Sequence, residues 1–241
     1  MSTGQPPLPT RGNRLLDRLP KDEYERLFPL LTPVELAFEQ VLYEFRGSIE
    51  YAYFPTGAVT SSLAVMLDGS AIEVATVGTE GLVGHTAAFG SGKTSPNKVI
   101  VQIGDGGLRI EARALRRETA RGGPLLDLLD DYHTAFMAQV SQSVACNGLH
   151  RLEQRCCRWL LMTRDRVGAD DLRLTHEFLA IMLGARRASV TEVLRPLQEA
   201  GLVRSHRGRI SILNGAGLEE RACECYRVVT DEYARLLGTP L

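Results

Sequence analysis

The chain has 241 residues, of which 44% are hydrophobic and 24% charged, with a formal net charge of −1, so it is long enough to bury one or two substantial cores. No apolar run approaches the length of about 18 residues that a membrane-spanning helix requires, and the polar start, rich in Pro and Gly, does not resemble a signal peptide. These features exclude a membrane partner, and we expect a cytoplasmic protein.

Residues 1–13 are predicted to form a flexible tail, followed by short helices that Pro20, Pro29 and Pro33 interrupt. From about residue 37 to residue 110, segments rich in β-branched and aromatic residues alternate with Gly-containing turns. These segments are Glu50–Phe54, Ala58–Met66, Ala71–Val77 and Lys98–Ile103. Short strands at regular spacing are typical of a β-sandwich or jelly roll, which we predict for residues 14–124.

Residues 125–167 are predicted to form one long helix. Apolar residues recur in it at helical spacing, at Leu126, Leu129, Phe136, Met137, Val140, Val144, Leu149, Leu152, Trp159 and Leu160. Such a seam suits pairing with a second copy of the chain, packing on the chain's own β-domain, or both. A linker is expected at residues 168–171, and a last helix from about Leu218 to Leu237.

The stretch from Leu174 to Asn214 is the most informative part of the chain. Thr175 is a suitable N-cap, and two sets of apolar residues at helical spacing follow it, ending at Gly184 and Gly201. A basic hairpin with Gly208 at its tip comes next. Two helices at a Gly-containing turn followed by a hairpin predict a winged helix-turn-helix, whose second helix enters the major groove of duplex DNA.

The charge of this stretch agrees with DNA as the partner. Residues 172–214 contain seven arginines and three glutamates, a net charge of +4, which leaves −5 for the remainder of the chain. A basic module on a mildly acidic body is the electrostatic pattern of a phosphate-binding surface. An ordinary solvated surface is the alternative, but the arginines gather at the turn, the second helix and the hairpin tip.

No catalytic motif stands out, so an enzyme is not expected. The sequence lacks a recognisable nucleophile triad or paired carboxylates, and His176-Glu177 has no second histidine at the spacing of a metalloprotease motif. The run Gly90–Thr94 resembles the end of a P-loop. However, Ala87 stands where that motif needs glycine, and Pro96 opposes the helix that should follow.

The five cysteines are Cys146, Cys156, Cys157, Cys223 and Cys225. Their odd number, with no Cys-x-x-Cys pair, argues against a disulfide framework. Cys223 and Cys225 together with Cys156 and Cys157 are one conceivable metal or redox site. The favoured interpretation is that all five are small apolar helix residues, so no metal site is predicted.

The order of a β-roll, a long helix, a linker and a winged helix resembles the Crp/Fnr superfamily of bacterial transcription regulators over about residues 15–215. The residues that carry the resemblance are Tyr53-Phe54-Pro55-x-Gly57, Arg151-Leu152-Glu153-x-Arg155 and, most specifically, Thr175-x-Glu177-x-Leu179-Ala180-x-x-Leu183-Gly184-x-x-Arg187. The resemblance implies an α+β chain with an N-terminal double-stranded β-helix or jelly roll as a cyclic-nucleotide-binding-like sensor domain (14–124). It also implies a central dimerisation helix (125–167) and a DNA-binding domain (168–241).

The implied function is that of a homodimeric, sequence-specific regulator that pairs through residues 125–165 and binds double-stranded DNA. RNA polymerase and an unknown small-molecule effector are further partners to consider. The alternative is a small-molecule-binding module whose winged helix serves protein contacts. The positive charge of residues 172–214 and Arg187 argue against that alternative.

The resemblance also implies roles for single residues. Arg187 is expected to read guanine, because its guanidinium can donate two hydrogen bonds to guanine O6 and N7. Phosphate contacts fall to Thr175, His176, Arg186 and Ser189, and to the basic hairpin residues His206, Arg207 and Arg209. Ala188 and Glu192 depart from the glutamate and arginine of the best-known members, so the operator should differ from theirs. Pro196 is expected to bend the reading helix.

The phosphate-binding cassette of cyclic-nucleotide sensors is degenerate in this chain. Gly84-His85 replaces a Gly-Glu pair, and Asn97-Lys98 falls where an arginine is expected. Lys98 lacks the planar two-donor fork that suits a phosphate, so no cofactor is identified and cyclic AMP is not expected to bind. The cysteine positions do not fit an iron–sulfur sensor, and the isolated histidines His85, His133 and His150 are weak candidates for haem ligands.

Overall fold

The computed structural model describes residues 12–89, 93–238 and 241. The predicted tail up to residue 11 and most of the P-loop-like run lie outside these residues. The prediction of a flexible tail over residues 1–13 is wrong at Asn13, which is buried and whose amide donates to Pro55 O and Gly81 O, both over 2.9 Å. Asn13 Oδ1 also caps the first helix, α1 (Arg14–Arg18).

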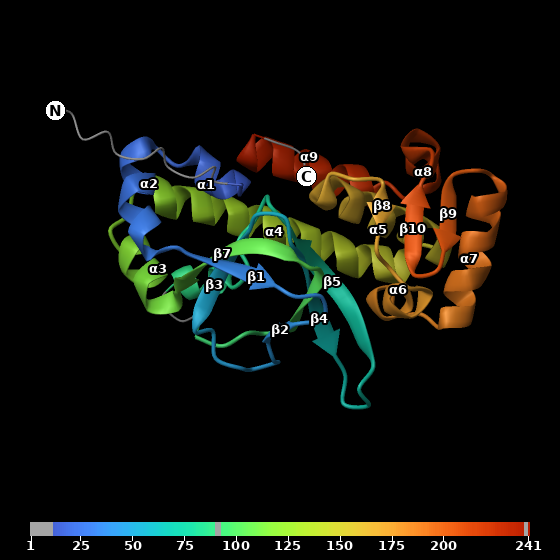
Figure 1. Ribbon diagram of the computed structural model, residues 1–241, viewed down its shortest axis with the longest axis horizontal. Helices are drawn as coiled ribbons and strands as arrows, with labels where there is room; N and C mark the ends of the chain where they lie inside the picture. Colours follow the sequence, from blue (N-terminus) through green and yellow to red (C-terminus); the bar gives the residue numbers. More distant parts are fainter. Residues whose placement is uncertain (1–11, 90–92, 239–240) are drawn as a thin grey trace.

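Two antiparallel sheets form the β-roll (Figure 1). One sheet has the order β1-β7-β3 and consists of β1 (Thr32–Leu36), β7 (Asp105–Glu111) and β3 (Tyr51–Pro55). The other has the order β2-β6-β4-β5 and consists of β2 (Val41–Tyr43), β6 (Lys98–Ile103), β4 (Val59–Val65) and β5 (Ala71–Val77). Leu36 and Val101 pack between the sheets. The predicted jelly roll and its four strands are thereby confirmed.

Short helices cover one end of the roll: α2 (Lys21–Leu27), the 3₁₀ turns η1 (Phe28–Leu30) and η2 (His85–Ala88), and α3 (Ala112–Thr119). Their apolar faces join those of α1 and of the next helix in one buried cluster. The largest fully buried side chains include Tyr24, Tyr132 and Tyr233. Together these helices form the left end of the molecule in Figure 1.

The prediction of a single long helix over residues 125–167 is wrong, because the segment forms two helices, α4 (Pro124–Leu149) and α5 (Leu152–Val167). The break falls at His150 and Arg151, whose backbones are extended. Arg151 N donates to Gln154 Oε1 over 3.2 Å, which satisfies a donor at the start of α5. A local cap thus ends one helix and begins another.

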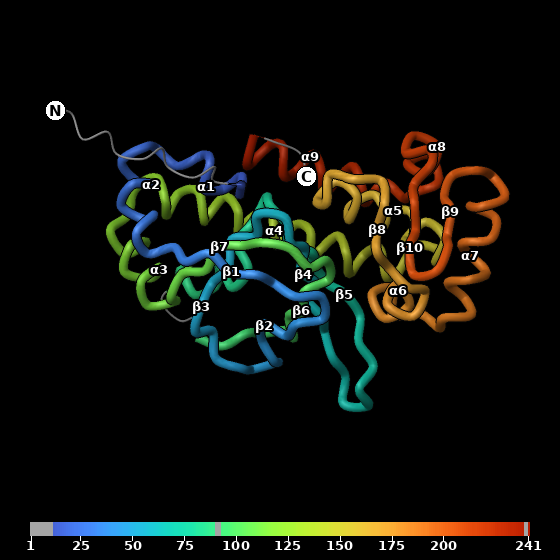
Figure 2. The backbone as a smooth tube through the Cα atoms, in the orientation of Figure 1, coloured from blue at the N-terminus to red at the C-terminus, as the bar shows by residue number. Residues whose placement is uncertain are grey.

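The last helix expected from Leu218 is also two helices, α8 (Gly215–Arg221) and α9 (Cys225–Leu237). Asn214 Oδ1 accepts from Gly217 N over 2.9 Å and caps α8, and the backbone of Ala222 is extended where α8 ends. α9 lies along α4 (Figure 2), and Val229 and Tyr233 pack with residues of α4 in one buried cluster.

The C-terminal module contains α6 (His176–Met182), α7 (Arg187–Glu199) and a small sheet. The sheet has the order β8-β10-β9, formed by β8 (Asp171–Leu172), β10 (Arg209–Ile212) and β9 (Val203–His206). Phe178, Leu194 and Ile210 share its buried core. The predicted winged helix-turn-helix is confirmed. Among the described residues, no helix is long and apolar enough to cross a membrane.

Candidate nucleic-acid interface and ligand cavity

Local backbone chemistry sets the helix-turn-helix geometry. Thr175 Oγ1 accepts from Phe178 N over 3.0 Å and starts α6, as predicted. Gly184 has a φ of 57°, a left-handed conformation that favours glycine, and it turns the chain between the two helices. A Cβ at this position would lie 2.7 Å from Ile72 of β5, so the turn is also packed against the β-roll.

The first turns of α7 present a polar face to solvent. Its buried residues are Val190, Leu194 and Leu197. Its exposed residues are Arg187, Ala188, Thr191, Glu192, Arg195, Gln198 and Glu199, while Arg186 is exposed just before the helix and Ser189 is half-buried. The residues predicted to contact DNA on this helix therefore share its accessible side. α7 continues through Pro196 to Glu199.

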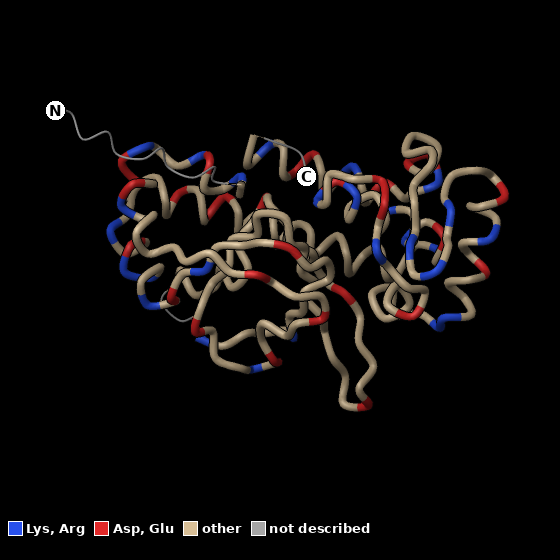
Figure 3. The backbone as a smooth tube through the Cα atoms, viewed as in Figure 1, with Lys and Arg blue, Asp and Glu red and all other residues tan. Residues whose placement is uncertain are grey.

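The wing is a hairpin with a two-residue tip. Arg207 and Gly208 have φ values of 44° and 78°, and His206 pairs with Arg209 across the turn. Positive φ at both central residues is the signature of a type I′ turn. His206, Arg207 and Arg209 are exposed, and Figure 3 shows basic residues along both wing strands. Arg209 Nη1 lies 3.8 Å from Asp171 Oδ2.

His176 is placed differently from the expectation of a phosphate contact. Its Nδ1 lies 2.9 Å from Thr191 Oγ1 and its Nε2 lies 2.8 Å from Ser205 Oγ. The Thr191 hydroxyl donates to Arg187 O, so a neutral ring that donates from Nδ1 satisfies all three groups. Burial, assisted by the Arg187 charge, lowers the pKa of His176. His176 therefore positions α7 and the wing relative to α6.

A cavity of about 250 Å³ lies between the β-roll and α4. Gly84, His85 and Asn97 of the predicted cassette line it, but Lys98 does not. Successive side chains along a strand point to opposite faces, so Lys98 points away from the cavity that its neighbours line. Its Nζ lies 3.3 Å from Glu44 Oε1. The inclusion of Lys98 in the cassette is therefore wrong.

The described lining of the cavity contains no Arg, Lys, Asp or Glu. His85 Nε2 lies 3.1 Å from His133 Nδ1, and the His85 ring packs on Phe136 with centroids 4.6 Å apart. Burial lowers the pKa of His85 to about 3, so its ring is neutral at physiological pH. The described lining therefore offers no guanidinium or ammonium group to a phosphate.

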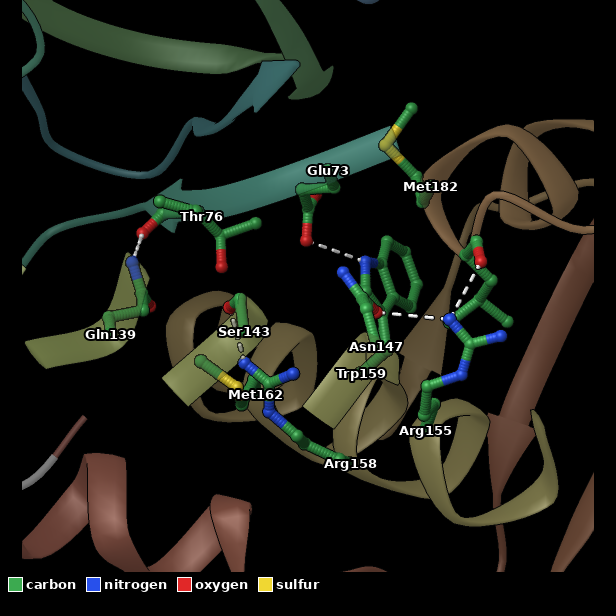
Figure 4. A pocket seen from close by; sticks show the side chains of 12 residues that line it. Glu73, Thr76, Gln139, Ser143, Asn147, Arg155, Arg158, Trp159, Met162 and Met182 are labelled. Atoms are coloured by element: carbon green, nitrogen blue, oxygen red, sulfur yellow. Dashed lines mark hydrogen bonds between the residues drawn. The ribbon is translucent and has the colours of Figure 1, made fainter. Parts of the chain in front are cut away.

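A polar network joins the β-roll to the helices that carry the DNA-binding module (Figure 4). Trp159 Nε1 of α5 donates to Glu73 Oε1 of β5 over 2.9 Å. Arg155 Nη1 donates to Leu183 O, at the end of α6, over 3.1 Å. The space enclosed here is only about 20 Å³, the size of about one water molecule, so the network is a junction and not a ligand site.

An ion pair makes a second junction. Arg166 Nε of α5 lies 2.8 Å from Glu80 Oε1 in a turn of the β-roll, and the two side chains are 0% and 3% exposed. Arg166 Nη2 also donates to Gln139 Oε1 of α4 over 2.7 Å. A Cβ on Gly78 would lie 2.9 Å from Arg166 Cβ, so glycine permits this close approach.

Sequence reasoning missed one cluster of side chains. Cys223 and Cys225 lie beside Cys146 and His150, with one candidate ligand atom from each within 4.8 Å of the others. Cys156 and Cys157, proposed as their partners, lie in a separate apolar core. The spacing Cys146-x-x-x-His150 at the end of a helix was the available signal, because residues four apart share a helix face.

An exposed second helix, a basic wing and a jelly roll with a cavity beside α4 make up a winged helix-turn-helix module joined to a β-roll. Comparison with known proteins agrees. Residues 154–221 match the Crp-like helix-turn-helix domain. A relative named "Transcriptional regulator SdrP", from Thermus thermophilus, is 27% identical over 185 residues, which cover 73% of this chain and 86% of the relative.

Solved structures share the fold over most of the chain. FixK2 from Bradyrhizobium japonicum superposes with a TM-score of 0.69 at 16% identity, covering 80% of this chain and 98% of FixK2. A Crp/Fnr-family regulator from Eubacterium rectale gives 0.66 at 17% identity, covering 90% and 100%. The chain therefore carries a Crp-like helix-turn-helix domain and shares the fold of these two structures.

Proposed function

We propose that this regulator binds its operator in the cytoplasm as a homodimer, reads bases with the start of α7, and responds to a ligand that is not a cyclic nucleotide. The observation that carries the proposal is the exposed face at the start of α7, beside an exposed basic wing. RNA polymerase remains a partner that the family implies.

Within this proposal, Arg187 reads guanine, because its guanidinium offers two donors to O6 and N7. Ala188 and Glu192 set the neighbouring preferences, the alanine by contact with a thymine methyl and the glutamate by accepting from cytosine N4. Phosphate contacts come from Thr175, Arg186 and Ser189 and from the wing residues His206, Arg207 and Arg209. Their arginines make affinity fall as salt rises.

The test compares two single-arginine variants of α7 by fluorescence anisotropy, on an operator duplex first selected from a random pool by the wild-type protein and on random duplex. Arg187→Ala should lose about 1–3 kcal/mol on the operator, which is about 5–150-fold, and little on random DNA. Arg195→Ala removes the same charge two turns further along the same exposed face and is the matched control. Equal weakening on both DNAs by Arg187→Ala would contradict the assignment.

Homodimerisation is supported by an unpartnered apolar stripe on α4. Met137 and Val144 are 46% and 65% exposed, and Val140 lies between them on the same side of the helix. Spacings of three and four residues are those of a coiled-coil seam. A symmetric pair along this seam would place two copies of α7 in successive major grooves, about 34 Å apart.

The effector proposal rests on the cavity between the roll and α4. Its described lining has no Arg, Lys, Asp or Glu, which favours a small, largely apolar ligand with a few hydrogen-bonding groups, for which His85, His133 and Asn97 are available. Met137 and Val140 belong to both the cavity lining and the seam, so a ligand bound here would act directly on the contact between the two copies.

A further inference from the structure

Four metal-ligating side chains meet where the end of α4 lies against the connection between α8 and α9. Cys146 lies in the last turn of α4 and His150 directly follows that helix. Cys223 lies between α8 and α9, and Cys225 is the first residue of α9. The three cysteines are fully or almost fully buried and His150 is half-buried.

The spacing of the candidate ligand atoms suits tetrahedral coordination. Cys146 Sγ and Cys223 Sγ are 3.5 Å apart, and Cys225 Sγ and His150 Nδ1 are 3.4 Å apart. With metal–sulfur bonds of about 2.3 Å and metal–nitrogen bonds of about 2.0 Å, ligand atoms of a tetrahedral site lie about 3.5–3.8 Å apart. Four protein ligands leave no open position, which is the arrangement of structural sites.

Neighbouring groups match those that surround a bound metal. His150 turns Nδ1 toward Cys225, while its Nε2 lies 3.3 Å from Glu224 Oε2. Histidine ligands commonly donate their second ring N–H to a carboxylate in this way, which orients the ring and increases its basicity. Gln142 Nε2 also donates to Cys225 Sγ over 3.1 Å.

A buried arginine supplies positive charge beside the cluster. Arg158 is 9% exposed and donates Nη2 to Ser143 Oγ over 2.8 Å, one turn before Cys146 (Figure 4). Three thiolates and one divalent metal ion have a net charge of −1, which the guanidinium offsets.

We propose that these four side chains bind one Zn²⁺ ion, which fastens the α8–α9 connection to the end of α4. Thiolate and imidazole ligands in a tetrahedral arrangement select zinc over magnesium, calcium or manganese. The cysteines bind as thiolates, so the protons of the thiols pass to the buffer as the metal enters. Because Cys146 and Cys223 are 77 positions apart, metal binding requires α9 to be docked and stabilises that docking.

The first test uses the full-length wild-type chain, purified without chelator and analysed for bound metal by mass spectrometry. We expect one zinc ion per chain. After zinc is removed under reducing conditions, titration with Co²⁺ should give one equivalent of a tetrahedral visible spectrum with thiolate-to-cobalt charge-transfer absorption. The absence of stoichiometric zinc together with the absence of that absorption would overturn the proposal.

Variants then assign the ligands. Cys223→Ser and Cys225→Ser should each abolish the one-equivalent spectrum, whereas Cys157→Ala is the matched control, because Cys157 is an equally buried cysteine outside the cluster. Glu224→Gln provides a second test in case a cysteine variant fails to fold. The Glu224 side chain is 70% exposed, so its replacement should not disturb the core. It should weaken zinc binding about 10-fold, measured by competition with a chromophoric chelator.

Two further results would contradict the site. Loss of the cobalt spectrum in Cys157→Ala would place the metal elsewhere. The metal-free protein could also contain a Cys146–Cys223 disulfide and, after its reduction, bind neither Zn²⁺ nor Co²⁺. That result would make this cysteine pair a thiol–disulfide switch instead of a metal site. None of these measurements uses DNA, so their failure would leave the proposed function untouched.

Discussion

Replacing Arg166 by methionine should lower the free energy of unfolding by about 3–5 kcal/mol, because it leaves the buried Glu80 carboxylate without its partner. The Glu80 side chain is 3% exposed, so water cannot replace the lost cation. The substitution also removes hydrogen bonds to Gln139 Oε1 and Met162 O, of 2.7 and 3.0 Å. Most of the cost is that of an uncompensated buried charge.

A second substitution separates this charge effect from lost packing. Gln at position 80 is neutral, and its side-chain oxygen can still accept from Gly78 N, which now donates to both Glu80 oxygens over 3.1 and 3.2 Å. The double variant Glu80→Gln/Arg166→Met should therefore be about 2 kcal/mol more stable than Arg166→Met alone. Urea unfolding curves, compared by midpoint at equal slope, measure both differences.

The reasoning would be refuted by a loss below about 1 kcal/mol in Arg166→Met, the value of an exposed pair. It would also be refuted if the double variant were no more stable than the single one. Either result would mean that this junction between the β-roll and α5 is not held by charge.

Three further predictions concern the junction, the seam and the cavity. Burial raises the pKa of Glu73 to about 7, so the folded state retains a proton that the unfolded state releases. Stability should therefore fall by up to about 3 kcal/mol as pH rises from about 4.5 to about 7, and Glu73→Gln should flatten that dependence in urea unfolding. Val144→Glu should weaken self-association about tenfold or more in sedimentation, because symmetry brings two carboxylates together at the seam; unchanged association would argue against the seam. Cyclic AMP at millimolar concentration should leave the Tm unchanged, and a rise of several degrees would show binding.

The winged helix-turn-helix was predictable because its signals are local. The Thr175 cap, Gly184 at the turn and the Arg207-Gly208 tip each act within a few residues along the chain. The strands of the β-roll were predictable for the same reason, since Gly-containing turns separate runs of β-branched residues.

The features that could not be predicted from the sequence depend on tertiary contacts or on which face of a strand a side chain occupies. Lys98 is one residue away from Asn97, yet alternation along a strand places it outside the cavity that Asn97 lines. The partners of His176 come from α7 and β9, so its role is visible only in the folded domain.

The cysteine cluster shows the same limit. The helix break after α4 and the docking of α9 bring Cys146 and Cys223 together from positions 77 residues apart. A sequence alone does not state which of five cysteines will meet.

Selection of bound duplexes from a random pool tests most directly whether a symmetric pair of α7 helices reads DNA. We expect enrichment of a two-fold symmetric site whose half-sites are centred about 10 base pairs apart, each containing a guanine whose preference is lost in Arg187→Ala. No enrichment over random duplex, or a single half-site without a symmetric partner, would contradict DNA reading by such a pair.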